Sequence, residues 1–204
     1  MHHSNRIIAA YGSGSFEMLE IPSGKVLSTF DNETDWGPLA MCVSQDDQWL
    51  VVGYGGGTVE VWNLNNRTRL HRFKEHSTNV SRVTLSDDGR YFFSADWVGV
   101  VKMWDLLSGQ LIREFEYSRD DNEKKNPHTW RCQSMASIGD LLVVGFDDRY
   151  IRAWDFITGE LRFEIPDAQR HWVKHIVGLS NNRSFVSACA WGPINLWSQE
   201  GELL

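Results

Sequence analysis

The sequence predicts an all-β fold built from about five repeated units, each a set of four antiparallel strands. One observation is a set of five segments that align without gaps, with the letters FEMLE, VEVWN, VKMWD, IRAWD and INLWS. Their fourth residues lie 43, 42, 50 and 43 positions apart, and they are Leu19, Trp62, Trp104, Trp154 and Trp197. The other observation is that apolar residues alternate with period two in each segment, which is typical of strands, and the segments are too short for helices. The fold therefore repeats every 43 residues or so.

Further strands are expected on both sides of each repeated segment. A polar turn follows each one, and these turns read PSGK at 22–25, NNRT at 65–68, LSGQ at 107–110, ITGE at 157–160 and QEGE at 199–202. Gly, Asn and Ser supply the backbone angles that hairpin turns need. A strand follows four of these turns, and two more apolar runs precede most of the segments, such as LAMCVS and WLVVGYG before VEVWN. Four strands per unit account for the period.

The five units differ in completeness. The length of 204 residues predicts a single domain that spans residues 1–204. The first unit, residues 6–30, begins near Ile7 with its second strand and so lacks an innermost strand. The last unit, residues 171–204, stops where its fourth strand should begin. Three whole units lie between them, and we expect these at residues 35–74, 76–117 and 128–166.

The unit at residues 76–105 has the most specific letters. Its features include the turn LSDDGR and the pair Trp104-Asp105, with His76 and Ser94 at matching spacing. In these letters and in its repeat the chain resembles the WD-repeat (WD40) family over nearly its whole length. The resemblance implies a β-propeller, in which each four-stranded sheet is one blade of a ring.

The length of the chain bears on whether that ring is closed. Seven blades of ~43 residues would need about 300 residues. The chain is therefore expected to be a piece of a larger ring or an open arc, and the alternatives are a tight five-bladed ring and a half that needs a partner. An open arc would expose strand edges, which predicts association with other chains.

The resemblance also implies a buried hydrogen-bonded chain in each blade, made of a His, a Ser or Thr, an Asp and the repeated Trp. Such a chain leaves no buried polar group without a partner. The residues expected in these structural roles are Trp62, Trp104, Trp154, Trp197, His76, Ser94, Asp148 and Ser187.

Several units depart from that pattern. Val98 stands at the acidic position of the unit that ends at Trp104, and Val144 replaces the Ser of the next unit, which keeps Asp148 and has His128 near the His position. In the unit of Trp62, Val52 stands at the Ser position and Gly56 stands at the acidic position. In the last unit Trp191 stands where the Asp belongs, and His171 is out of register. These units are expected to depend on apolar packing more than on polar chains.

Five of the ten tryptophans fall in predicted loops, and they are Trp36, Trp97, Trp130, Trp172 and Trp191. In a propeller these loops lie on one face, where the family usually binds partners, and Trp and Arg often dominate interfaces. Family positions that face the channel mouth indicate partner-binding residues, namely Asn79, Ser81, Trp97, Arg131, Asp147, Trp172 and Lys174. The alternative is that the tryptophans cover gaps between blades, above all Trp36, Trp130 and Trp191. The long charged loop at 118–128 is either solvated or a partner-clasping loop.

Composition and charge restrict the partners. The formal net charge is −7, and no dense basic run is present, which argues against nucleic acid and anionic membranes. The N-terminal letters contain neither a signal sequence nor a spanning segment, so a cytoplasmic or nuclear location is expected. The partners expected are other proteins or peptides, and an oligomer or larger complex could form through the open ends.

Residues for catalysis are not apparent in the sequence. The three cysteines, Cys42, Cys132 and Cys189, are too scattered for a disulfide framework or a zinc site, and no His has metal-ligand spacing. We therefore expect no enzyme activity, no metal and no cofactor, and a non-catalytic scaffold or adaptor. The alternative is a fragment of a quinoprotein-like propeller enzyme, since AWDFITGELRF at 153–163 also resembles the quinoprotein repeat. Only this unit shows that pattern.

Overall fold

The computed structural model describes residues 5–12, 14–31, 36–115, 131–179 and 183–204. Their strands form five separate antiparallel sheets, and neighbours in sequence are neighbours in each sheet. The strands are β1 (Arg6–Ala10), β2 (Phe16–Glu20) and β3 (Val26–Phe30) in sheet 1; β4 (Pro38–Val43), β5 (Trp49–Tyr54), β6 (Thr58–Asn63) and β7 (Thr68–Lys74) in sheet 2; β8 (Val80–Leu85), β9 (Tyr91–Asp96), β10 (Val101–Asp105) and β11 (Leu111–Phe115) in sheet 3; β12 (Cys132–Ile138), β13 (Leu141–Phe146), β14 (Ile151–Asp155) and β15 (Leu161–Ile165) in sheet 4; and β16 (His175–Gly178), β17 (Ser184–Ala188) and β18 (Asn195–Ser198) in sheet 5.

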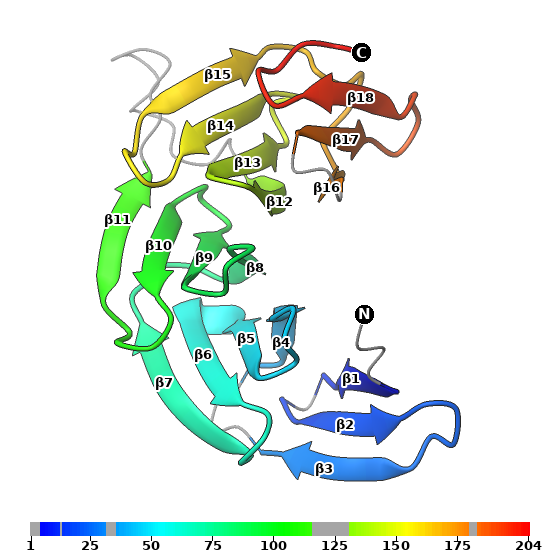
Figure 1. The fold of residues 1–204 in the computed structure, drawn as a ribbon, viewed down its shortest axis with the longest axis vertical. Coiled ribbons are helices and arrows are strands. Elements are labelled where there is room, and N and C mark those ends of the chain that lie inside the picture. The colour runs from blue at the N-terminus through cyan, green and yellow to red at the C-terminus, as the bar shows by residue number, and fades with distance from the viewer. Residues whose placement is uncertain (1–4, 13, 32–35, 116–130, 180–182) are drawn as a thin grey trace.

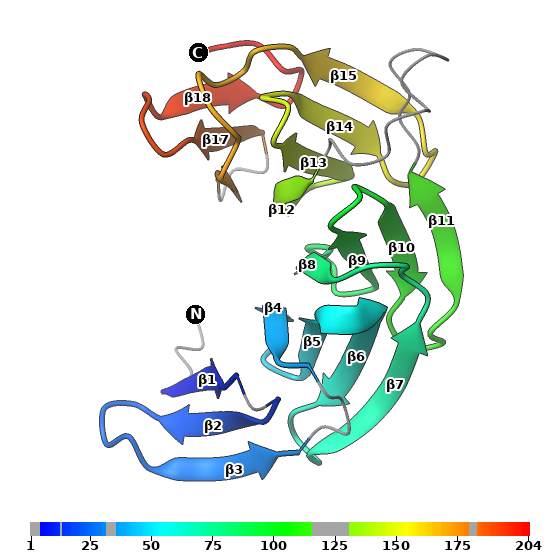
Figure 2. The same cartoon turned by 180° about the vertical axis from the view of Figure 1, so that it is seen from behind.

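The five sheets stand side by side around a centre and form an open arc (Figures 1 and 2). The strands β4, β8, β12 and β16 lie nearest the centre, and β3, β7, β11 and β15 lie at the outside. Sheets 2, 3 and 4 have four strands each, whereas sheets 1 and 5 have three. The predicted incomplete propeller, with three whole units and partial first and last units, is thereby confirmed.

The end of the chain begins to add to sheet 5. Leu203 forms an isolated antiparallel bridge with Trp197, and the Leu204 N–H donates to the Leu196 carbonyl at 2.9 Å. These contacts lie on the outer edge of β18, where a fourth strand would pair. The partial last unit therefore stops at the start of its fourth strand.

Aromatic side chains join each sheet to the one before it. The repeated Trp packs against a Phe from the outermost strand of the preceding sheet in three of the four junctions. The ring centroids of Phe30 and Trp62 lie 5.6 Å apart, those of Phe73 and Trp104 4.9 Å, and those of Phe115 and Trp154 5.7 Å. Sheet 1 has Leu19 at the equivalent position, and no sheet precedes it. The repeated Trp is thus the residue that packs neighbouring sheets together.

One glycine is required by such a junction. The 3-10 turn η1 (Gly55–Gly57) joins β5 to β6, and Gly57 has a φ of +84°. A Cβ atom at Gly57 would collide with the backbone carbonyl of His76 in the loop before β8. The close approach of two chain segments therefore explains the glycine.

Sheet 3 has a polar chain from Trp104 through Ser94 to His76, and an acidic side chain lies beside His76 although Val98 stands at the expected acidic position. The Trp104 indole N–H donates to Ser94 Oγ at 2.9 Å, and Ser94 Oγ lies 2.7 Å from His76 Nε2. The acidic group is Asp96, whose Oδ2 lies 3.2 Å from His76 Nδ1. Asp96 can serve because it is two residues after Ser94 on the same strand, so both side chains point to the same face.

Sheet 2 replaces this chain with a buried carboxylate, so the expectation that it depends on apolar packing is also wrong. The side chain of Glu60 is fully buried and accepts hydrogen bonds from the Trp62 indole and the Tyr54 hydroxyl, both at 2.9 Å. Arg69 Nη1 lies 3.1 Å from the other oxygen of Glu60. A different set of residues thus provides the partner that the indole N–H requires.

Sheets 4 and 5 contain two further variants. In sheet 5 the Trp197 indole and the Gln169 amide both donate to Ser187 Oγ at 2.8 Å, so Gln169 stands where a His was expected. In sheet 4 Asp148 pairs with the buried Arg152 at 2.9 Å, and Arg152 also pairs with Glu164 at 2.6 Å. His128 lies outside the described residues.

Candidate functional site

The predicted partner-binding residues lie at one end of the innermost strands. Some precede an innermost strand, as Arg131 precedes β12, and others follow a second strand, as Trp97 follows β9. Because every sheet has the same strand order, these loops lie on the same face of the arc. We call this face the upper rim and define it by Asn79, Trp97, Arg131, Asp147, Trp172 and Lys174.

Hydrogen bonds connect the loops of the upper rim. The side-chain oxygen of Asn79 accepts a hydrogen bond from the Gly56 N–H of sheet 2 at 2.8 Å. The backbone carbonyl of Asn79 accepts the Trp97 N–H at 3.0 Å. In sheet 4 the Arg131 N–H donates to Asp147 Oδ1 at 2.9 Å, and the Asp147 N–H donates to the Arg131 carbonyl at 3.1 Å. The loops are therefore held in place relative to one another.

Two indoles of the upper rim are exposed and carry cations on their faces. Trp97 is 42% exposed, and the Arg131 guanidinium lies 5.2 Å from the centre of its ring. Trp172 is 51% exposed, and Lys174 Nζ lies 4.6 Å from its ring centre. Such cation–π contacts fix the position of the cation and the ring together. Sheets 3, 4 and 5 thus contribute to one aromatic and cationic surface.

Ser81 does not belong to this surface. The residue is only 6% exposed, and its hydroxyl lies within hydrogen-bond distance of the carbonyls of Ala95 and Cys132, at 3.3 and 3.2 Å. The contact with Cys132 connects β8 to β12. We therefore correct the prediction for Ser81, which joins two sheets instead of facing a partner.

The remaining loop tryptophans differ from one another. The side chain of Trp36 lies against the glycines of η1, close to where Cβ atoms at Gly55 and Gly56 would be, which fits a covering role. Trp191 is 80% exposed and makes an edge contact with His171, with ring centroids 5.7 Å apart. Trp130 and the loop at 118–128 lie outside the described residues.

The structure adds two residues that the sequence did not indicate. Arg82 Nε donates to the Gln133 carbonyl at 2.6 Å, and Lys174 Nζ donates to Gln133 Oε1 at 2.9 Å. Gln133 therefore brings together cations from sheets 3 and 5, which are far apart in sequence. A local pattern could not reveal this contact, since it depends on the curvature of the arc.

Asp147 is the one carboxylate of the upper rim. Partial burial raises its pKa above the usual value, and the nearby charge of Asp148 acts in the same direction. The Arg131 N–H and the positive charge of Arg131 oppose this shift. The Asp147 carboxyl is thus partly buried and is held in place by its contact with Arg131.

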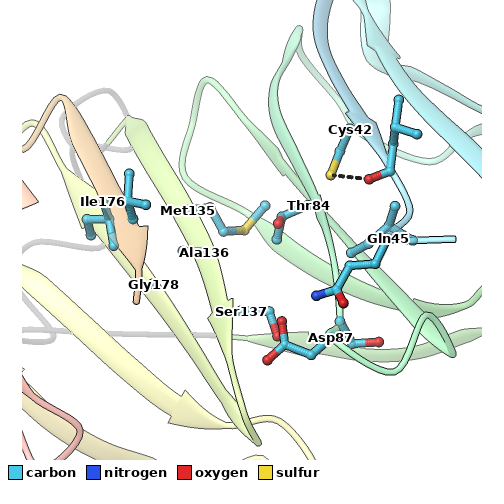
Figure 3. A pocket seen from close by; sticks show the side chains of 13 residues that line it. Cys42, Gln45, Thr84, Asp87, Met135, Ala136, Ser137, Ile176 and Gly178 are labelled. Carbon is cyan, nitrogen blue, oxygen red and sulfur yellow. Dashed lines mark hydrogen bonds between the residues drawn. The ribbon is translucent and has the colours of Figure 1, made fainter. Parts of the chain in front are cut away.

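A pocket of about 270 Å³ lies at the opposite end of the innermost strands (Figure 3). Figure 3 shows the side chains of Thr84 and Met135 between Cys42 on one side and Ile176 on the other, with Asp87 and Ser137 at one end. Burial raises the pKa of the Cys42 thiol, which disfavours the reactive thiolate. Asp87 accepts the N–H of Gly139 at 3.0 Å, so it serves in a turn contact between sheets. The pocket does not present an activated nucleophile.

No group of three or more His, Cys, Asp or Glu side chains among the described residues could hold a metal ion. No helix there is long and apolar enough to cross a membrane.

Known proteins show a consistent pattern of similarity. The family described as WD domain, G-beta repeat matches residues 24–63 and 67–105. The WD repeat domain-containing protein 83 homolog of Dictyostelium discoideum is 26% identical over 161 residues, which are 78% of this chain and 46% of that protein. The guanine nucleotide-binding protein subunit beta of Oryza sativa subsp. japonica is 22% identical over 205 residues, which are 96% of this chain and 54% of that protein. The chain therefore spans about half the length of these curated relatives.

Solved structures share the fold. The computationally designed Ika8 protein superposes with a TM-score of 0.82 at 21% identity, covering 100% of this chain and 59% of the designed chain. The β-propeller domain of Myceliophteria thermophila Cps50 (Swd1) superposes with a TM-score of 0.81 at 12% identity, covering 98% of this chain and 67% of that domain. With the repeated tryptophans and the four-stranded sheets, these similarities show WD repeats at residues 24–63 and 67–105 and a β-propeller fold for the chain.

Proposed function

We propose that this chain is a non-catalytic interaction module that binds other proteins or peptides through the upper rim. The observation that carries the proposal is the pair of exposed indoles, Trp97 and Trp172, each positioned by a cation and by linked loops. Large aromatic side chains that are fixed in place lose little entropy when they bind, and they commonly dominate protein interfaces. Relatives with WD repeats support this class of function, and one of them is by name a subunit.

The quinoprotein alternative gains no support from its segment at 153–163. Asp155 accepts the Thr158 N–H at 2.9 Å, and Gly159 follows with a φ of +85°. The turn after β10 has the same arrangement, in which Asp105 accepts the Ser108 N–H at 2.9 Å and Gly109 has a φ of +72°. The quinoprotein-like letters therefore describe a turn that two sheets share.

The open ends of the arc support association with further chains. On sheet 5, Val177 pairs with Val186, and Val186 pairs with Leu196, so these three residues lie on one face. Val177 is exposed there, and Ile7 is exposed on sheet 1. Exposed apolar surface and free strand edges both favour binding to another protein. Light scattering of the purified chain tests this proposal, because a folded monomer of 23.5 kDa would contradict association through the ends.

Capture of cross-linked proteins tests the role of the upper rim. The Trp97→Ala, Trp172→Ala double variant should lose most of the proteins that the wild-type chain captures from cells. A matched control is the Leu111→Ala, Leu161→Ala double variant, which removes exposed apolar side chains from the outermost strands β11 and β15. Equal capture by a folded tryptophan variant and by the wild type would contradict the proposal.

A further inference from the structure

Three cations gather where the upper rim meets the innermost strands. We call Arg82, Arg131 and Lys174 the cation cluster. Arg82 and Lys174 both donate to Gln133, at 2.6 and 2.9 Å, and Arg131 precedes Gln133 by two residues. Sheets 3, 4 and 5 each contribute one member, so the cluster exists only in the folded arc.

Within the described part of the chain, the three cations of the cluster have one nearby carboxylate, Asp147, with which the charge of Arg131 interacts. Among the residues that the structure describes, the ion pairs involve other basic side chains, such as Arg149 with Asp167 and Arg162 with Asp155, and none includes a member of the cluster. Asp147 is the nearby carboxylate, and it accepts the backbone N–H of Arg131. Asp148 is already paired with Arg152. Among the described residues the local charge is therefore positive, in a chain whose net charge is −7.

The surroundings of the cluster hold the charges in place. Arg82 uses Nε and Nη1 to bind the carbonyls of Gln133 and Ser81, each at 2.6 Å. Arg131 lies over the ring of Trp97, and Lys174 lies over the ring of Trp172. Cations that are fixed before binding lose less entropy on meeting an anion than mobile ones. Carboxylates match them well, because guanidinium and ammonium groups form charge-assisted hydrogen bonds with carboxylate oxygens.

The combination of exposed indoles and fixed cations specifies the kind of partner. We propose that the cation cluster binds an acidic segment of a protein partner, with carboxylates at Arg131, Lys174 and Arg82 and an apolar side chain against Trp97 or Trp172. This inference rests on the proposed function of the upper rim and names the chemistry of its partner. A nucleic acid is less suited, since it needs a longer basic track along its phosphates, and the cluster is compact.

Binding of defined peptides tests the inference. The probe is a short fluorescein-labelled peptide of Asp and Glu around a central Leu, and its counterpart has Asn and Gln at every acidic position. Fluorescence anisotropy should show the acidic peptide binding at least about tenfold more tightly, and this preference should fall as salt screens the charges.

Two pairs of variants locate the site. The Arg131→Gln, Lys174→Gln double variant should weaken binding of the acidic peptide by about tenfold or more. The Arg90→Gln, Arg162→Gln double variant removes the same total charge from exposed positions elsewhere and should bind within about twofold of the wild type. Circular dichroism and the unfolding midpoint establish that both variants are folded.

The outcomes separate this inference from the function on which it rests. Equal binding of the two peptides, or equal loss in both double variants, would overturn the acidic partner. Preference for a single-stranded oligonucleotide over the acidic peptide would also overturn it. If the Trp97→Ala, Trp172→Ala variant loses captured proteins while the charge variant keeps them, the upper rim still binds partners and the acidic chemistry is refuted. If neither variant alters capture, both proposals fail.

Discussion

The space between the sheets and the upper rim both contain tryptophans, but in different surroundings. Between sheets 2 and 3, Trp104 is 2% exposed, stacks on Phe73 and donates its indole N–H to Ser94. At the upper rim, Trp97 is half exposed, and no residue in the described part of the chain accepts its indole N–H. A buried indole with a satisfied N–H stabilises the fold, whereas an exposed one beside a fixed cation can bind another molecule. The same residue type therefore serves two purposes in one repeat.

The largest difference between the two regions should appear on truncation of a tryptophan. Trp104→Ala leaves a cavity between sheets 2 and 3 and removes one of the two hydrogen bonds of Ser94 Oγ, so the free energy of unfolding should fall by about 3–5 kcal/mol. Trp97→Ala should change it by less than about 0.5 kcal/mol, since surface substitutions seldom cost more. Denaturant unfolding monitored by circular dichroism measures both. Similar losses in the two variants would contradict the division into core and surface tryptophans.

The buried carboxylate of sheet 2 should have the next largest effect. Glu60→Ala removes the carboxylate that accepts hydrogen bonds from the Tyr54 hydroxyl and the Trp62 indole N–H. Each unpaired buried donor costs about 1–3 kcal/mol, so we expect a loss of about 3 kcal/mol in the free energy of unfolding. Glu60→Gln keeps an acceptor oxygen and should lose clearly less. Equal losses in the Ala and Gln variants would show that the polar contacts of Glu60 contribute little.

Ser187 in sheet 5 should matter less than Glu60. Ser187→Ala removes the acceptor of the Trp197 indole, but the Gln169 amide keeps its bond to the Ser187 backbone carbonyl at 3.0 Å. With one buried donor left unpaired, the loss should be about 1–2 kcal/mol, measured by the shift of the denaturation midpoint. Ser198→Ala on β18 is a control on a half-buried hydroxyl near the edge of the same sheet. A larger effect of Ser198→Ala would contradict the importance of the Trp197 contact.

Cys132 follows Arg131 of the upper rim directly in sequence, and its thiol tests how fully the core is buried there. Full burial raises the pKa of its thiol from 9.0 to about 12. The unfolded chain therefore ionises first as the pH rises, and the stabilisation associated with the neutral thiol is lost between about pH 9 and pH 12. The free energy of unfolding should decline less steeply in this range for Cys132→Ala than for the wild type. Cys189→Ala, at a half-buried position, is the matched control and should follow the wild-type slope.

The repeat and its incomplete ends could be predicted from the sequence because they are local properties. Alternation with period two and the spacing of Trp62, Trp104, Trp154 and Trp197 define the strands and the number of sheets. The polar groups around the indoles were harder to predict. Glu60, which accepts the Trp62 indole N–H, and Gln169, which donates to Ser187, come from residue types outside the family pattern, and Asp96 beside His76 replaces the expected position 98. Any suitable donor or acceptor in reach can satisfy a buried indole, so the partner depends on which side chains meet between strands.

The candidate site shows the same limit. Loop positions such as Trp97, Arg131 and Lys174 could be assigned to one end of the strands from the order of the strands alone. Whether Ser81 is buried, and which side chains gather around Gln133, depends on how neighbouring sheets approach each other. The charge of the upper rim was therefore visible only in the folded arc.

The most direct test of the central claim compares stability and binding in one variant. The Trp97→Ala, Trp172→Ala double variant is unfolded by denaturant and is also used in capture of cross-linked proteins, beside the wild type and the Leu111→Ala, Leu161→Ala control. We expect an unfolding free energy within about 1 kcal/mol of the wild type and loss of most captured proteins. Unchanged capture by a variant of wild-type stability would contradict the claim that the upper rim binds partners.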